Sequence, residues 1–139
     1  KMVNGSKKAI EIAWLFHGTN AGAVSQIVRQ GFNRSYAGRN GSVYGKGCYF
    51  ARYATHSVGF AKPDAAGVMK VLMCRVAVGD FCKGNKKHVN PDPKSECSRT
   101  HFDSTVDDIR NPYFFVTYHD DQAYPEYVVT FKKKKNTKK

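Results

Sequence analysis

The sequence predicts an α+β domain whose sheet is largely antiparallel. Two observations lead to this class: several short runs of β-branched and aromatic residues are typical of strands, and only one segment has clear helical periodicity. The chain has 139 residues, of which 41% are hydrophobic, and this is enough for one small domain with a core. We assign residues 1–131 to this domain and residues 132–139 to a basic tail that is expected to be disordered.

The first elements are a short strand and the helix. A buried strand is predicted at residues 14–16, and a helix follows over Ala21–Gln30. Asn20 stands at the N-cap position of this helix, and Gly31 stands where a glycine commonly ends a helix. Its predicted apolar face consists of Val24, Ile27 and Val28.

The rest of the chain predicts strands that are separated by loops. The expected strands are residues 48–51, 68–78, 81–83, 102–106, 113–118 and 127–131. One or two helical turns are predicted within residues 53–60, and Pro63 limits their length. Glycine-rich residues 33–42 and polar residues 84–100 are predicted to be surface loops, and residues 119–125 a turn.

Charge and cysteine usage narrow the classes of function. The net charge is +12, but six lysines of the tail supply half of it. The charge therefore does not indicate a nucleic-acid-binding face, although a basic RNA-binding module stays an alternative. We expect no membrane span and no signal peptide, because no long apolar run is present. Four scattered cysteines favour reduced thiols in the cytosol or nucleus.

Two common site types are poorly supported. Residues 41–47 only partly match a phosphate-binding P-loop, because the spacing is one residue short and no Ser or Thr follows Lys46. A Rossmann glycine pattern is absent from the sequence. The residues that could bind zinc are widely spaced, and we expect no metal site among Cys74, Cys82, His88, Cys97 and His101.

The strongest functional signal combines residues 17–19 with residues 44–60. A glycine directly after a strand lets the backbone approach a flat ligand closely, and Gly18 follows the strand that ends near His17. Tyr49 and Phe60 supply ring faces, and Ser57 supplies a hydroxyl. Two backbone hydrogen bonds, one hydroxyl bond and ring stacking suit an aromatic carboxamide.

These motifs, taken in order, resemble a known family. His17-Gly18-Thr19, the run from Tyr44 to Ala51, Ser57 and Phe102-Asp103-Ser104 are similar to the catalytic domain of the poly(ADP-ribose) polymerase-like (diphtheria-toxin-type) ADP-ribosyltransferases. Residues 31–38 and 121–127 are most similar to the branch whose members often carry macrodomains. The resemblance implies a split, mostly antiparallel β-sandwich that binds NAD between its half-sheets. Family members usually have a further strand and helix before the His17 position.

The resemblance also implies a role for individual residues toward NAD. His17 is implied to bind the adenosine ribose, and the Gly18 backbone and Ser57 hydroxyl are implied to bind the nicotinamide amide. Tyr49 and Phe60 are implied to sandwich the nicotinamide ring. At the Phe60 position the family usually has tyrosine. The remaining residues implied to contact NAD are Thr19, Arg34, Tyr36 and Tyr44.

The third catalytic position has two candidates in this sequence. Glu126 lies in a Tyr-Pro-Glu-Tyr run that matches the context of the glutamate in chain-forming members. Alignment from the C-terminal end instead places Phe114 there, and we favour the set His17, Tyr49 and Phe114. We then interpret Glu126 as a turn residue near the end of a strand. An apolar third residue is the pattern of mono-ADP-ribosyltransferases.

The implied function is transfer of one ADP-ribose from NAD to a protein side chain, with release of nicotinamide. Protein acceptors, which include the chain itself, and benzamide-type inhibitors are the expected partners, and neither nucleic acid nor a membrane is required. The alternatives are an NAD-binding or ADP-ribose-binding pseudoenzyme, a chain-forming polymerase that uses Glu126, the RNA-binding module named above, and an RNA 2′-phosphotransferase.

Overall fold

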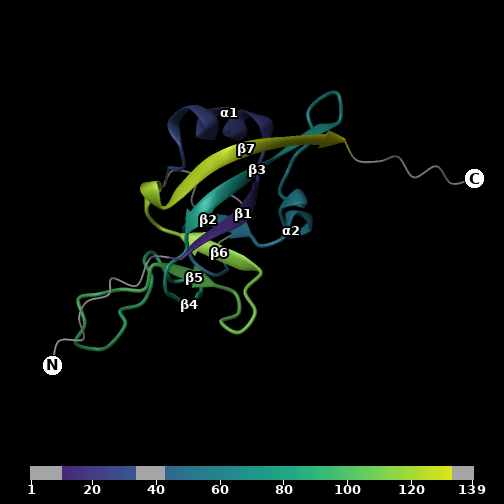
Figure 1. Cartoon of the computed structure of the whole chain (residues 1–139). Coiled ribbons are helices and arrows are strands. Elements are labelled where there is room, and N and C mark those ends of the chain that lie inside the picture. Colours follow the sequence, from purple (N-terminus) through teal and green to yellow (C-terminus); the bar gives the residue numbers. More distant parts are fainter. Residues whose placement is uncertain (1–10, 34–42, 133–139) are drawn as a thin grey trace, which may run out of the picture.

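The protein folds around a single seven-stranded sheet (Figure 1). A computed structural model describes residues 11–33 and 43–132. The strands are β1 (Ile12–Gly18), β2 (Cys48–Ala51), β3 (Val68–Ala77), β4 (Phe81–Lys83), β5 (Ser104–Val106), β6 (Phe114–Thr117) and β7 (Ala123–Lys132). Their order in the sheet is β4-β5-β6-β2-β1-β3-β7. Only the pairing of β4 with β5 is parallel among these strands, so the predicted α+β class with a largely antiparallel sheet is confirmed.

Among the neighbouring strands of the sheet, β1 and β2 share the fewest paired residues. β1 pairs with β3 along its whole length, from Ile12 opposite Ala77 to Gly18 opposite Val71. In contrast, β1 and β2 share only the pair Phe16 and Ala51. This junction separates a long half (β1, β3 and β7) from a half of short strands (β4, β5, β6 and β2). The split between two half-sheets that the family resemblance implies therefore lies at this junction, within one continuous sheet.

The first helix, α1 (Ala21–Gln30), has the predicted boundaries. The Asn20 side chain accepts a hydrogen bond from the Ala23 amide at 2.8 Å, and Gly31 adopts a φ of 77° at the other end. α1 packs over β3 (Figure 1). The prediction for Val28 was wrong, because this side chain is exposed and Ala23 is buried beside Val24 and Ile27.

The two faces of the sheet carry separate hydrophobic clusters. Leu15 of β1 belongs to the larger cluster beneath α1, together with Ile27 and Phe50. Phe16, the next residue, points to the other face and packs beside Met69 and Val71. This alternation is the two-residue period of a strand. The second helix, α2 (Ala54–Val58), contacts β1, β2 and β3.

The C-terminal strand differs most from the prediction. β7 begins at Ala123, and the predicted turn at residues 119–125 is reduced to a 3₁₀ turn at Asp120–Gln122. Glu126 therefore lies inside β7 and its interpretation as a turn residue was wrong. It is the extra residue at a register shift, because its neighbours Pro125 and Tyr127 pair with the consecutive residues Cys74 and Met73 of β3. β7 is an edge strand, and edge strands tolerate a proline such as Pro125 because no ladder hydrogen bond is lost on the open side.

The predicted surface loop at residues 84–100 is exposed over most of its length, with a few internal contacts. His88 is buried, and its Nε2 lies 2.7 Å from Asp92 Oδ1. An isolated bridge joins Pro93 to His101. Neither α1 nor α2 is long and apolar enough to cross a membrane.

Candidate active site

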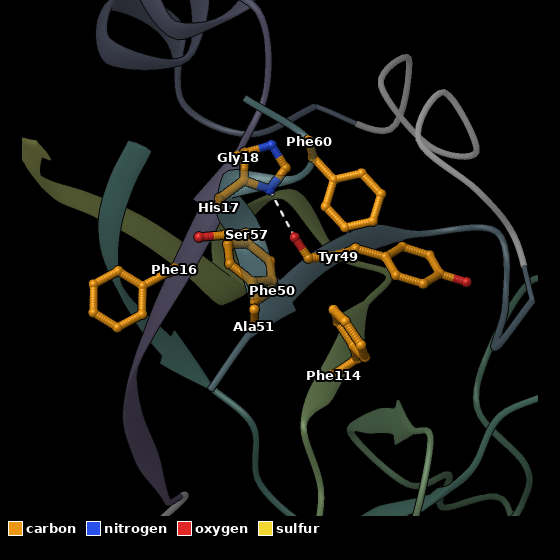
Figure 2. Close-up of a pocket in the computed structure, with 9 residues that line it drawn as sticks. All are labelled: Phe16, His17, Gly18, Tyr49, Phe50, Ala51, Ser57, Phe60 and Phe114. Carbon is orange, nitrogen blue, oxygen red and sulfur yellow. Dashed lines mark hydrogen bonds between the residues drawn. The ribbon is translucent and has the colours of Figure 1, made fainter. Parts of the chain in front are cut away.

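A pocket lies where β1 and β2 diverge beyond their single shared pair (Figure 2). β1, β2, β6 and the α2 region all contribute to its wall. Its lining consists of Phe16, His17, Gly18, Tyr49, Phe50, Ala51, Ser57, Phe60 and Phe114. The structure thus brings together residues that lie almost one hundred positions apart in the chain, and six of them are predicted site residues.

His17 is held in one orientation by the strand opposite. Its Nδ1 lies 2.7 Å from the backbone oxygen of Tyr49. Because a carbonyl oxygen only accepts hydrogen bonds, Nδ1 carries the proton and Nε2 is the nitrogen that can accept a bond from a ligand hydroxyl. Burial lowers the pKa of His17, and the hydrogen bond to Tyr49 opposes this shift. The imidazole is therefore neutral at neutral pH.

Gly18 allows β1 and α2 to approach closely. A Cβ atom at this position would lie 1.9 Å from the backbone oxygen of Ser57. The side chain of Ser57 is buried, and its hydroxyl donates to the Ala54 backbone oxygen at 2.8 Å. The hydroxyl oxygen can still accept a hydrogen bond, for example from a carboxamide N–H. The glycine is therefore required by contact within the chain, a reason that the sequence did not show.

Tyr49 forms one side of the pocket, and its hydroxyl both donates and accepts a hydrogen bond within the chain. The hydroxyl donates to the Gly45 backbone oxygen at 2.8 Å and accepts from the Tyr44 amide at 2.9 Å. Burial raises the pKa of the Tyr49 phenol, so the donor proton is retained. Tyr44 thus supports Tyr49 and does not line the pocket.

Two partly exposed aromatic rings, Phe60 and Phe114, complete the wall. The cavity volume is about 20 Å³, which is close to the space that one water molecule needs. Figure 2 shows Phe60, Tyr49 and Phe114 arranged around the opening.

The two candidates for the third catalytic position lie in different places. Phe114 is the first residue of β6 and lines the same pocket as His17 and Tyr49. Glu126 lies on β7 and pairs with Arg75 of β3, with Glu126 Oε1 2.6 Å from Arg75 Nε. The set His17, Tyr49 and Phe114 is therefore the one that converges on the pocket.

The other predicted residues fall into two groups. Thr19 is buried next to Gly18 but does not line the pocket. Arg34 and Tyr36 lie outside the described residues, as do residues 133–139 of the lysine tail. Three lining residues were not predicted: Phe16, Phe50 and Ala51. The available signal was their position beside His17 and Tyr49 in predicted strands.

Potential metal ligands do not gather in the described part of the chain. No three His, Cys, Asp or Glu side chains there are placed to hold an ion. All four cysteines are free, and burial raises the pKa of the Cys74 thiol to about 12. This places Cys74 in the core as an apolar side chain.

Comparison with known proteins decides the family. The family model described as "Poly(ADP-ribose) polymerase catalytic domain" matches residues 4–133. The chain belongs to this family. Membership in the poly(ADP-ribose) polymerase family, predicted from the motifs, is thereby confirmed.

Individual relatives in the poly(ADP-ribose) polymerase family agree with this assignment. Human "Protein mono-ADP-ribosyltransferase PARP14" is 45% identical over 122 residues, which are 86% of this chain and 7% of that protein. Mouse "Protein mono-ADP-ribosyltransferase PARP10" is 40% identical over 120 residues, which are 85% of this chain and 12% of that protein. The chain therefore spans only a small part of the length of the relatives it matches.

A solved structure shows the same fold. The crystal structure of the PARP domain of Arabidopsis RADICAL-INDUCED CELL DEATH1 aligns with a TM-score of 0.73 and 22% sequence identity. The alignment covers 91% of this chain and 70% of that one. Within this family fold, the pocket at the β1–β2 junction is the place where the predicted motif residues meet.

Proposed function

We propose that this domain is an NAD-dependent protein mono-ADP-ribosyltransferase. It transfers one ADP-ribose from NAD to a protein side chain and releases nicotinamide. The observation that carries the proposal is the convergence of His17, Tyr49 and Phe114 on one pocket whose described lining includes no carboxylate. The names of the relatives, which are mono-ADP-ribosyltransferases, support it.

The pocket residues fit the two ends of the scissile bond. Gly18 on β1 lies against the backbone of Ser57 on α2, and both residues line the pocket, where the Gly18 backbone and the Ser57 hydroxyl can bind the carboxamide of nicotinamide. Tyr49 and Phe60 are the rings that can stack on its pyridine face. The neutral imidazole of His17 can accept a hydrogen bond from a ribose hydroxyl.

The residues of this chain contribute by holding the two parts of NAD in the orientation that the reaction needs. NAD supplies the ADP-ribose unit, and cleavage of its nicotinamide–ribose bond develops positive charge on the ribose. The binding residues hold nicotinamide and ribose in a fixed relative orientation, which lowers the entropic part of the barrier. In chain-forming members a glutamate at the third catalytic position polarises the ribose hydroxyl that accepts the next unit. Phe114 is apolar and has no such group, so we expect no chain extension.

Incubation with labelled NAD tests this proposal. We expect label on an acceptor protein or on the domain itself, and intact-mass analysis should show additions of single ADP-ribose units. A ladder of long polymers would contradict the role of Phe114. Complete absence of label, together with retained NAD binding, would contradict the transfer and leave an NAD-binding pseudoenzyme.

A ligand-binding measurement tests the pocket separately from transfer. Addition of 3-aminobenzamide should raise the melting temperature, because a ligand at 100 times its Kd stabilises the folded state by about 2.7 kcal/mol. The variant Ser57→Ala should show a smaller shift than the wild type. An unchanged melting temperature for the wild type would contradict a carboxamide pocket.

The cellular setting is also part of the proposal. The domain works in the cytosol or nucleus and modifies protein acceptors there. The four free cysteines support a reducing compartment. Neither a nucleic acid nor a metal ion is proposed to take part in the transfer.

A further inference from the structure

A chain of buried hydroxyl groups lies behind Tyr49. Tyr118 follows the last residue of β6, and Thr105 lies at the centre of β5. Both side chains are buried, and their hydroxyl oxygens are 2.7 Å apart. The Thr105 hydroxyl donates to the backbone oxygen of Tyr44 at 2.9 Å. Since this uses the single Thr105 proton, Tyr118 is the donor to Thr105 at 2.7 Å, and its hydroxyl also lies 3.4 Å from the Tyr44 backbone oxygen.

The same backbone segment holds the hydroxyl of Tyr49. The Tyr44 amide donates to this hydroxyl, and the hydroxyl donates to Gly45. One series of contacts therefore runs from the Tyr118 phenol through Thr105 to the backbone oxygen of Tyr44, and from the backbone amide of the same residue to the Tyr49 phenol.

The segment is also held from its other side. The Lys46 amide donates to the backbone oxygen of His88 at 2.8 Å. Gly45 has a φ of 135°, and a Cβ atom there would lie 1.9 Å from the Tyr118 hydroxyl oxygen. The missing side chain thus lets the phenol of Tyr118 pack directly against the backbone that it supports. Burial raises the pKa of Tyr118 to about 12, so its hydroxyl remains a donor.

We propose that Tyr118 and Thr105 are positioning residues for the pocket: through the backbone of Tyr44 and Gly45 they fix the ring of Tyr49 in the orientation that stacks on the ligand. Neither residue lines the pocket. In Figure 2 the Tyr49 ring extends away from His17, with its hydroxyl at the far end, so the ring can be held in place from outside. The effect on ligands rests on the proposed function.

The physical reason is preorganisation of a narrow site. A tyrosine ring that is fixed before binding loses no rotational freedom when it stacks on a ligand. Strand β6 has a double role in this arrangement, because Phe114 at its start lines the pocket and Tyr118 just after its end anchors the opposite segment. Displacement of that anchor releases Tyr49 without a change in any lining residue.

A double-mutant cycle tests the proposal on the folded domain. Tyr118→Phe, Thr105→Val and Tyr49→Phe each remove a hydroxyl from the series, and each should raise the Kd for 3-aminobenzamide about three- to tenfold, the range expected for one hydrogen bond. The combination Tyr118→Phe with Tyr49→Phe should bind no more weakly than Tyr49→Phe alone, because both changes break the same series. Tyr124→Phe, at an exposed position on β7, is the matched control and should bind as the wild type does.

Amide hydrogen exchange gives a readout that needs no ligand. In Tyr118→Phe the Tyr44 amide should exchange about three- to tenfold faster, since its partner Tyr49 is less well held. Multiplicative increases in Kd in the double variant, or unchanged Tyr44 exchange in Tyr118→Phe, would overturn the proposal. Failure of the wild type to bind 3-aminobenzamide would contradict the proposed function and the positioning role together, whereas faster Tyr44 exchange in that case would still establish the hydroxyl series.

Discussion

Two clusters on the same sheet use similar residue types in opposite ways. The pocket cluster (His17, Tyr49 and Phe114) lies at the β1–β2 junction. The outer cluster (Trp14, Arg75, Glu126 and Tyr127) lies on β1, β3 and β7. In the outer cluster the rings of Trp14 and Tyr127 stack at 6.2 Å and stay about half exposed, and the Arg75 guanidinium lies 6.0 Å above Trp14.

The difference lies in what each cluster leaves for a ligand. Arg75 and Glu126 neutralise each other at the surface, with Arg75 half exposed. His17, by contrast, is buried and neutral, with its orientation set by one backbone bond. A buried polar group with remaining hydrogen-bond capacity can recognise a substrate, whereas an exposed ion pair is largely satisfied by its partner and water.

The largest expected effect is that of His17→Ala. Loss of the imidazole removes the group that orients the ribose, so the rate of labelling by NAD should fall about 100-fold. The corresponding change in the outer cluster, Trp14→Ala, should leave the rate within about twofold of the wild type, because Trp14 does not line the pocket. Equal losses in both variants would remove the functional distinction between the clusters.

Gly18→Ala should break the pocket cluster by displacing α2. The added Cβ would lie 1.9 Å from the Ser57 oxygen, and we expect a loss of about 1–3 kcal/mol in the free energy of unfolding. The thermal shift with 3-aminobenzamide should be lost as well. Gly59→Ala is the matched control, because no atom lies within 4 Å of the added Cβ. Normal binding by Gly18→Ala would show that the close β1–α2 approach is unnecessary.

The pH dependence distinguishes the buried imidazole from the exposed ion pair. The pKa of His17 is lowered from 6.5 in the folded state, so the unfolded chain takes up the proton first as the pH falls. The stability contribution of His17 is thus complete above pH 6.5 and is lost as the pH falls from there through the lowered pKa. Labelling should stay constant down to pH 6.5 and decline only below it.

The variant His17→Gln serves as the control for this titration. In this variant, the free energy of unfolding should lack the part of its pH dependence that comes from His17. Urea titrations between pH 4 and pH 8, about two units either side of an ordinary histidine pKa, measure this. A labelling rate that rises as the pH falls would contradict a neutral His17 in the active form.

The smallest effect is expected for Glu126→Gln. This change removes an ion pair in which Arg75 is half exposed, so the free energy of unfolding should fall by less than about 1 kcal/mol. The product should remain single ADP-ribose units, formed at the wild-type rate. A loss of labelling would assign Glu126 to the active site and reverse the comparison of the clusters.

Local signals account for the elements that were predicted correctly. The helix Ala21–Gln30 is bounded by an Asn cap and a Gly stop, which act over a few residues and so can be read from the sequence. The strands Cys48–Ala51 and Phe81–Lys83 also have the predicted bounds. Val28 and the start of β7 were mispredicted, because the packing of α1 and the pairing of β7 with β3 decide them.

The sequence by itself determined the family and most of the pocket residues, because the motifs at His17 and Tyr49 are local and distinctive. For the third catalytic position the sequence left two candidates, with Phe114 favoured, and only the tertiary structure shows where each of them lies. Both lie in strands, but the pairing of β6 with β2 carries Phe114 to the pocket and the pairing of β7 with β3 carries Glu126 away from it. The same is true of Tyr118 and Thr105, whose contact with Tyr44 spans 74 and 61 residues, because hydrogen bonds over such separations depend on strand order rather than on sequence neighbours.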